Sequence, residues 1–147
     1  MTIPVQGVNE LVVEVRDLVE AERFYTEVLG FPVIGRWTGD REAVWVLAGT
    51  TRIGLWRPQI GISRGRGGMH VHYAMRVAED DYADVVRKLR EQGAKVDEVT
   101  FGTDAEVKAR SAYVEDPDGH IVEFWTWDVT QGSPGAPTAV TPGVYGL

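Results

Sequence analysis

The chemistry of this chain has to come from a small set of side chains. Its 147 residues include three histidines and no cysteine, which excludes disulfides, thiolate catalysis and cysteine-based metal sites. Catalysis or metal binding would therefore rest on histidine, carboxylates, hydroxyls or a bound cofactor. Three such side chains lie in segments of alternating hydrophobicity, on what would be the polar face of a strand: Glu10, His72 and Glu123.

These three residues have the chemistry of a metal site. In the segment around His72, the apolar residues alternate with His70 and His72, which point the opposite way. One imidazole and two carboxylates suit a divalent metal ion such as manganese, iron(II), nickel or zinc. Water or two vicinal oxygens of a substrate would take the open positions, and the metal would act as a Lewis acid. We expect Glu123 to be catalytic as well as a metal ligand.

Each candidate also has a purely structural explanation. His72 could be a hydrogen-bonded histidine inside the sheet, and Glu123 would need a partner wherever it is buried. Glu10 could instead form a buried salt bridge with Arg76 or Arg110. His70 would lie about 6.8 Å from His72, one strand repeat away, as a pocket residue first and an alternative ligand second.

The elements that would hold these residues start with a strand over residues 8–15, where apolar and polar residues alternate. Asp17 then offers a helix N-cap, and the apolar residues that follow have helical spacing up to Gly30. Three more strands are predicted after this helix, over residues 31–36, 41–47 and 52–56. The first half is therefore a βαβββ module.

The second half of the chain repeats this plan. His72–Val77 aligns with Glu10–Val15, and Val122–Trp125 aligns with Ile53–Trp56. An internal repeat of this kind determines the architecture. We predict an α+β fold in which two tandem βαβββ modules form a curved, half-open mixed β-barrel with the helices outside.

The repeat also defines the organisation of the chain. One domain would span residues 1–128, with module one at about 7–57, a glycine- and arginine-rich linker at 58–69 and module two at about 70–128. Residues 129–147 are rich in Pro, Gly, Thr and Ala. We expect this tail to be irregular and to lie on the surface or on a partner.

Composition limits the partners. A net charge of −7 argues against nucleic-acid binding, which needs a basic surface, and favours cations instead. No apolar run approaches the roughly 20 residues of a membrane span, and the first residues do not resemble a signal peptide. We therefore expect a cytoplasmic protein that acts on a small molecule, with no nucleic-acid or membrane partner.

Two motifs resemble the vicinal-oxygen-chelate superfamily, which comprises glyoxalases, bleomycin-resistance proteins and dioxygenases. The opening of such a domain is similar to residues 9–18, 24–25 and 28–31, and its closing hairpin is similar to residues 112–120 and 122–124. The resemblance covers roughly residues 7–127 and implies metal ligands on the first and last strand of each module. Those positions fall on Glu10, where histidine is more usual, on His72 and on Glu123, whereas the fourth falls on Gly54. The resemblance also implies a homodimer.

Aromatic residues accompany these positions. Trp56 and Trp125 share strand faces with Gly54 and Glu123, and tryptophan there would suit a flat apolar or aromatic ligand. The rings would equally well fill the barrel or a dimer interface. Our predicted substrate-binding residues are His70, Trp56, Arg110 and Trp125.

Two functions follow from this pattern. The first is a divalent-metal-dependent lyase, isomerase, transferase or dioxygenase acting on a small oxygen-rich substrate; the three retained ligands resemble those of fosfomycin-resistance enzymes and extradiol dioxygenases. The second is a metal-free small-molecule or antibiotic-binding protein resembling bleomycin-resistance proteins, which the loss of a ligand at Gly54 favours. A regulatory or carrier domain for a small metabolite is a third possibility. Metal content would separate the first from the others.

Overall fold

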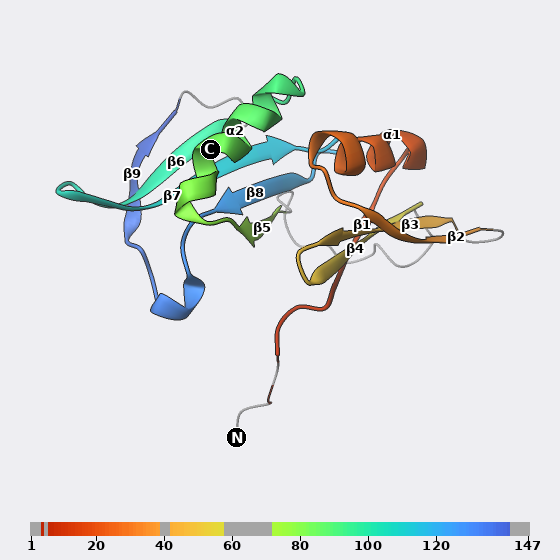
Figure 1. Ribbon diagram of the computed structural model, residues 1–147, viewed down its shortest axis with the longest axis horizontal. Coiled ribbons are helices and arrows are strands. Elements are labelled where there is room, and N and C mark those ends of the chain that lie inside the picture. Colours follow the sequence, from red (N-terminus) through yellow and green to blue (C-terminus); the bar gives the residue numbers. More distant parts are fainter. Residues whose placement is uncertain (1–3, 5, 39–41, 58–71, 142–147) are drawn as a thin grey trace. The chain divides into compact units, whose positions relative to one another are not determined.

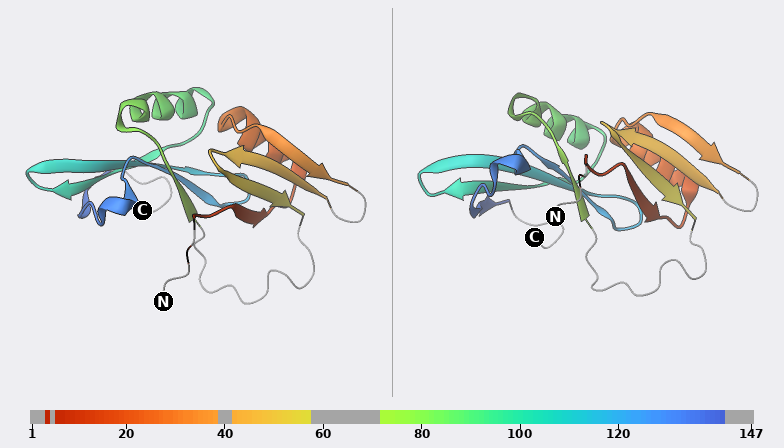
Figure 2. Two further views of the ribbon diagram at one scale, coloured as in Figure 1. Left: turned by 60° about the horizontal axis from the view of Figure 1, so that its bottom comes forward. Right: turned by 90° about the horizontal axis from the view of Figure 1, so that it is seen from below.

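The chain forms two compact units, Met1–Gly67 and Gly68–Leu147. The computed structural model describes residues 4, 6–38, 42–57 and 72–141 (Figure 1). Each unit contains one mixed sheet and one main helix that covers a face of its own sheet (Figure 2). Within the described residues, no helix is both long and apolar enough to cross a membrane.

Module one has the predicted order of elements. They are β1 (Glu10–Glu14), α1 (Leu18–Arg23), a π-helical turn η1 (Phe24–Val28), β2 (Val33–Trp37), β3 (Ala43–Ala48) and β4 (Thr51–Trp56). The Asp17 carboxylate accepts hydrogen bonds from the backbone N–H groups of Val19 and Glu20, both at 3.0 Å, and so caps α1 as predicted. Gly30 follows the helix with a φ of +75°, a conformation that favours glycine.

The first sheet has the strand order β1-β4-β3-β2, in which β1 and β4 are parallel and the other neighbours antiparallel. Alternation sends Val13, Ile53 and Leu55 to the buried face, which α1 and η1 cover with Ala21 and Tyr25. The opposite face carries Glu10 and Gly54. Glu10 pairs there with Arg52, and Gly54 pairs with Val12.

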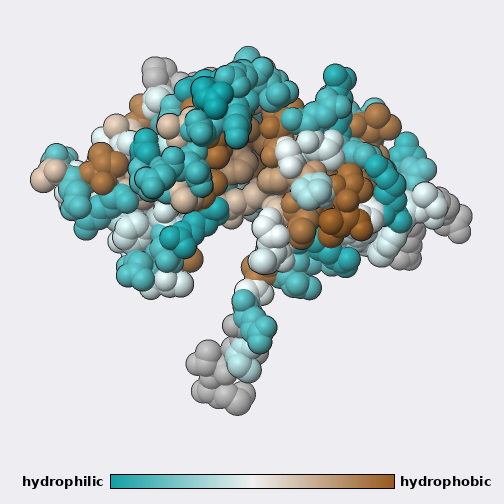
Figure 3. Space-filling model, viewed as in Figure 1, coloured by the Kyte–Doolittle hydropathy of each residue, from teal (hydrophilic) through white to brown (hydrophobic). Residues whose placement is uncertain are grey.

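Module two repeats this arrangement. Its elements are β5 (His72–Arg76), a 3-10 turn η2 (Glu79–Asp81), α2 (Tyr82–Glu91), β6 (Asp97–Thr103), β7 (Glu106–Glu115) and β8 (Ile121–Trp125). The sheet order is β5-β8-β7-β6-β9, so the first four strands match β1-β4-β3-β2. The helix α2 buries Tyr82, Val86 and Leu89, and hydrophilic residues cover its outward side (Figure 3).

The strand registers confirm the predicted alignment of the two halves. His72 pairs with Ile121 and Ala74 with Glu123 in parallel strands. The same pairing joins Glu10 to Arg52 and Val12 to Gly54 in module one. Glu123 and Gly54 therefore occupy equivalent positions, as do His72 and Glu10. The duplicated α+β fold is thus present.

The C-terminal tail differs from the prediction. We expected an irregular segment after residue 128, but it contains a 3-10 turn η3 (Val129–Gln131) and a strand β9 (Ala136–Val140) that pairs with β6. Thr141 extends the contact, because its N–H donates to the Glu98 carbonyl at 2.9 Å. A proline is compatible with this strand because β9 lies at the sheet edge. The predicted linker 58–69 lies outside the described residues.

Candidate metal site

Glu123 is the buried acid of module two. It lies on β8 with an exposed fraction of 5%. Paired residues share a face of the sheet, so Glu123 lies on the same face as Ala74 of β5 and Tyr113 of β7. The helix α2 contacts the other face, where its Tyr82 ring meets Arg110. The acid therefore points away from the helix, as predicted.

Two hydroxyl groups satisfy one oxygen of this acid. The Ser111 hydroxyl donates to Glu123 Oε1 at 2.5 Å, and the Tyr113 hydroxyl donates to the same oxygen at 3.0 Å. A buried carboxylate requires such partners because losing hydration costs free energy. Burial, together with the adjacent Glu123 charge, raises the pKa of Tyr113 to about 12, so the phenol remains a donor at neutral pH.

The second oxygen of Glu123 faces His72. His72 Nε2 lies 3.6 Å from Glu123 Oε2, and the His72 side chain is 43% exposed whereas that of Glu123 is 7% exposed. The separation is too long for a hydrogen bond between the two atoms. Neighbouring donors on one divalent cation, with bonds of about 2.1 Å, lie roughly 3.0–3.4 Å apart. The imidazole and the carboxylate therefore fit a shared metal ion with only a small adjustment.

Glu10, the third predicted ligand, belongs to the other unit. Glu10 Oε2 accepts hydrogen bonds from Arg52 Nε at 2.8 Å and Nη2 at 2.6 Å. A salt bridge was one of its predicted alternatives, but we expected Arg76 or Arg110 as the partner. Arg52 takes this role because it lies directly opposite Glu10 in the β1–β4 register.

Among the described residues, no group of three or more His, Asp or Glu side chains lies close enough together to hold a metal ion. The structure brings His72 and Glu123 together in module two. In module one, Glu10 lies with Arg52. His70 lies outside the described residues.

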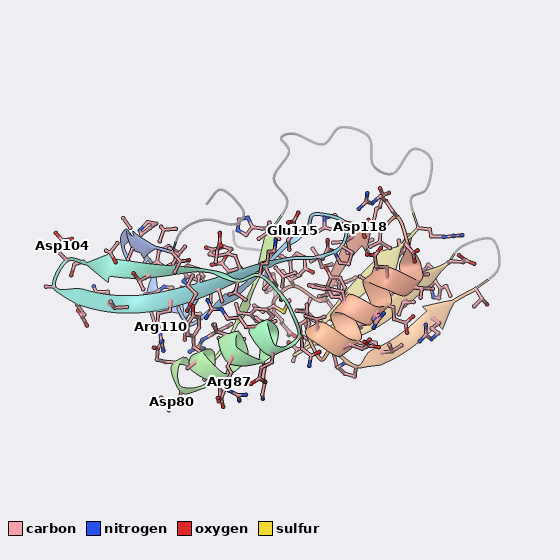
Figure 4. All side chains as sticks on the ribbon, turned by 90° about the horizontal axis from the view of Figure 1, so that it is seen from above. Asp80, Arg87, Asp104, Arg110, Glu115 and Asp118 are labelled. Carbon is pink, nitrogen blue, oxygen red and sulfur yellow. The ribbon has the colours of Figure 1, made fainter. Side chains whose placement is uncertain are left out.

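Arg110, a predicted substrate-binding residue, does not join the Glu123 group. Its guanidinium lies 4.4 Å from the centre of the Tyr82 ring and forms a 2.5 Å ion pair with Glu79. These contacts place it on the helix side of the sheet, near α2 and Arg87 (Figure 4). Arg76 is likewise engaged elsewhere, because it pairs with Asp128 at 3.3 Å.

Indole rings cover the Gly54 position in module one. A Cβ atom on Gly54 would lie 2.3 Å from Trp45 Cζ3 and 2.7 Å from Trp56 Nε1. The rings of Trp37, Trp45 and Trp56 form a triad with centroid separations of 5.3–5.8 Å. Aromatic rings thus take the space where Glu123 stands in module two.

Arg52 contacts one of these rings, and module two has an aromatic pair of its own. The Arg52 guanidinium lies 4.2 Å from the Trp45 ring centre, a cation–π contact. Trp125 shares the face of Ser111 in module two and lies 5.6 Å from the Phe101 ring. Within the described residues, the indole N–H groups of Trp45, Trp56 and Trp125 are buried without a hydrogen-bond partner.

Ser111 and Tyr113 are site residues that the sequence analysis missed. A signal for them was present, because both precede the Asp116–Gly119 turn at alternate positions of one strand. Folding that turn back places residue 113 opposite residue 123. Sequence inspection for metal ligands attends to His, Cys, Asp and Glu, so hydroxyl residues that hold a ligand in place go unnoticed.

Comparisons with known proteins find a family and related enzymes. The family model Glyoxalase/Bleomycin resistance protein/Dioxygenase superfamily matches residues 7–124. The chain is 29% identical to glutathione transferase FosA of Serratia marcescens over 126 residues, which cover 81% of the chain and 79% of that protein. It is 27% identical to metallothiol transferase FosB of Shouchella clausii over 125 residues, 83% of the chain and 81% of the relative.

Solved structures show the same fold. Lactoylglutathione lyase from Agrobacterium tumefaciens superposes with a TM-score of 0.67 at 20% identity, covering 84% of the chain and 96% of that structure. The fosfomycin resistance protein FosX from Listeria monocytogenes, solved with manganese(II) and sulfate, gives a TM-score of 0.62 at 15% identity and covers 86% and 96%.

Proposed function

The chain belongs to the glyoxalase/bleomycin resistance protein/dioxygenase superfamily, and from this premise we propose that it is a divalent-metal-dependent enzyme acting on a small oxygen-rich substrate. The observation that carries the proposal is the approach of His72 Nε2 to within 3.6 Å of Glu123 Oε2. A buried acid with one oxygen fully engaged and the other facing an imidazole has the donor chemistry of a transition-metal site.

The protein would hold its metal ion with His72 and Glu123, and the remaining positions would be open to water or substrate oxygens. The bound metal would supply Lewis-acid polarisation of a substrate oxygen. Manganese, iron(II), nickel and zinc all accept such a donor set. Among the possible reactions we favour group transfer, because the two curated relatives are a glutathione transferase and a metallothiol transferase.

The chain's own side chains would prepare this site. Ser111 and Tyr113 hold the Glu123 carboxylate in one orientation before a substrate arrives. Tyr113 keeps its proton because its pKa is raised to about 12, and it would present a neutral donor beside the acid. His72 is the more exposed partner, which gives solvent and substrate a route to the pair.

Metal analysis tests this function. Protein purified from metal-supplemented medium should contain about one equivalent of divalent metal, and His72→Ala and Glu123→Gln should each lose most of it. Matched controls are His120→Ala, in the turn before β8, and Glu115→Gln, an exposed acid at the end of β7 (Figure 4); both should keep the metal. Equal metal content in all four variants would contradict the proposal.

Enzymatic activity requires a second assay. The metal-loaded protein should couple glutathione to a small electrophile, and His72→Ala should abolish turnover. Retained turnover in both His72→Ala and Glu123→Gln would rule out this pair as the catalytic centre.

The tryptophan triad favours a second function, which is metal-free binding of an aromatic small molecule. The buried indole N–H groups of Trp45 and Trp56 have no acceptor in the part of the chain that the structure describes, and an unmet buried donor costs about 1–3 kcal/mol. Trp37 is 45% exposed, so a flat ligand with a hydrogen-bond acceptor would have access to the triad. Binding of 1-naphthoate that quenches tryptophan fluorescence equally with and without EDTA, and that Trp37→Leu weakens, would support this function over the metal-dependent one.

A further inference from the structure

We propose that Ser111 and Tyr113 are positioning residues that make Glu123 a one-oxygen metal ligand and thereby select small transition-metal ions over calcium. The inference rests on the proposed metal-dependent function and assigns a cation class to its site. Neither hydroxyl touches the metal in this scheme, because both act through the carboxylate.

The two oxygens of Glu123 have different neighbours. Both hydroxyls donate to Oε1, at 2.5 Å from Ser111 and 3.0 Å from Tyr113. The other oxygen, Oε2, is the one that lies 3.6 Å from His72 Nε2. A carboxylate whose first oxygen already accepts two hydrogen bonds presents its second oxygen to a cation.

The protein holds this arrangement rigidly. Ser111 is fully buried, and β7 pairs with both β6 and β8, so the backbone that carries both donors is held on two sides. The backbone carbonyl of Ser111 also accepts a hydrogen bond from the Tyr82 hydroxyl at 2.9 Å. Ser111 is thereby fixed on both faces of the sheet, by α2 on one and by Glu123 on the other.

Cations of different size need different numbers of carboxylate oxygens. Calcium takes six to eight oxygen ligands at about 2.3–2.6 Å and often uses both oxygens of a carboxylate. Zinc, nickel and iron(II) suit imidazole with fewer donors, and manganese accepts carboxylate and imidazole together. Engaging Oε1 therefore removes an oxygen that calcium would use, while the Oε2–His72 pair stays suited to the smaller ions.

Manganese electron paramagnetic resonance provides the test, since only free Mn²⁺ gives the strong solution signal. In the full-length protein Mn²⁺ should bind, and a large excess of Ca²⁺, on the order of 100-fold, should be needed to displace it. The Ser111→Ala/Tyr113→Phe variant should bind Mn²⁺ about 10-fold or more weakly, the usual cost of losing groups that orient a ligand. The Ca²⁺ excess required for displacement should fall by a similar factor.

Controls separate this role from stability. Thr26→Val also removes a half-buried hydroxyl, which donates to the Glu22 carbonyl in module one. It leaves both hydrogen bonds to Glu123 in place, so its Mn²⁺/Ca²⁺ preference should match that of the wild type. Tyr113→Phe alone keeps the ring, and it should show the same direction of change where the double variant does not fold.

The outcomes are distinct. Wild-type protein that binds no Mn²⁺ would overturn the metal-dependent function itself. Wild-type binding that Glu123→Gln abolishes, but that the Ser111 and Tyr113 variants leave unchanged in affinity and preference, would overturn only the positioning role.

Discussion

Single residues decide which module carries the proposed metal. Equivalent strand positions hold Glu123 in module two and Gly54 in module one. Around the glutamate stand two hydroxyls, and over the glycine lie two indole rings. The duplicated fold has thus diverged into one polar and one aromatic face, and the absence of a Cβ at residue 54 is what admits the rings.

Gly54→Ala should therefore destabilise the protein. The added Cβ would lie 2.3 Å from Trp45 Cζ3 and 2.7 Å from Trp56 Nε1, so the triad has to shift. Overpacking of this kind costs about 1–3 kcal/mol, measurable as a lower urea midpoint. Gly35→Ala is the matched control, since its Cβ would meet Trp45 no closer than 3.7 Å. Equal midpoints for the two variants would show that the triad yields freely.

Glu10 is the candidate ligand whose role a substitution can reveal directly. If its position binds the metal, Glu10→His should strengthen nickel or zinc binding about 10-fold, roughly 1.4 kcal/mol, because imidazole suits these ions better than carboxylate. Isothermal titration with nickel measures the change. Arg52→Gln serves as the control, because it breaks the same ion pair without adding a nitrogen donor. An unchanged affinity in Glu10→His would remove residue 10 from the ligand set.

At the level of elements, one ion pair ties the first helix to its sheet. Arg36 of β2 forms a two-pronged contact with Glu22 of α1, with Nη1 at 2.6 Å from Oε2 and Nη2 bonded to Oε1. The hydrogen bond from Arg36 lowers the pKa of Glu22, partial burial opposes this, and the attraction between the two charges adds to it. The contact stabilises the ionised carboxylate of the folded protein.

The stability difference between wild type and Glu22→Gln should depend on pH. Because the pKa of Glu22 is lowered on folding, its contribution is present above about pH 4.3, the ordinary pKa of a glutamate. The contribution is lost as pH falls through the lowered pKa. Near neutral pH the variant should be less stable by about 0.5–1 kcal/mol, typical of a partly exposed pair. Thermal unfolding at pH 7 and pH 3 checks this; a difference that persists undiminished at pH 3 would assign it to packing.

Local patterns were sufficient to predict most elements. The capping carboxylate of Asp17, the glycine at position 30 and the alternation from residue 10 to 14 are properties of short segments, and each appears in the structure where expected. The strand at 136–140 escaped prediction because its sequence, APTAV, combines a proline and two alanines, which are depleted in strands, and because it is held by pairing with distant β6.

The same limit applies to the site. The alignment of the halves brought His72 and Glu123 together correctly on one face, because the side-chain period of a strand is fixed. It did not identify Arg52 as the partner of Glu10, since that contact depends on which strand lies beside β1. Arg110 was assigned to the substrate face although its position in β7 is one residue from Ser111 and so faces α2.

For the whole molecule, we expect the C-terminal tail to contribute to stability and not to metal binding. The strand β9 pairs with β6 at the edge of the second sheet, whereas the Glu123 group lies on β5, β7 and β8. The described part of the tail touches β6 through Thr141 and Glu98 and closes on itself through Trp127 and Gly132. The hydroxyl groups that donate to the Glu123 carboxylate within the described residues, those of Ser111 and Tyr113, belong to β7.

Removing residues 129–147 should therefore separate stability from metal binding. The truncated chain would lose the β9–β6 hydrogen bonds and uncover the β6 edge, and an unpaired edge favours association between chains. We expect a lower melting temperature and concentration-dependent aggregation, with the Mn²⁺ affinity within about twofold of the full-length value, a difference of roughly 0.4 kcal/mol. Asp128 is kept so that Arg76 retains its partner. Light scattering and Mn²⁺ titration on the same samples test both halves; a loss of metal affinity in a folded truncated chain would make the tail part of the site.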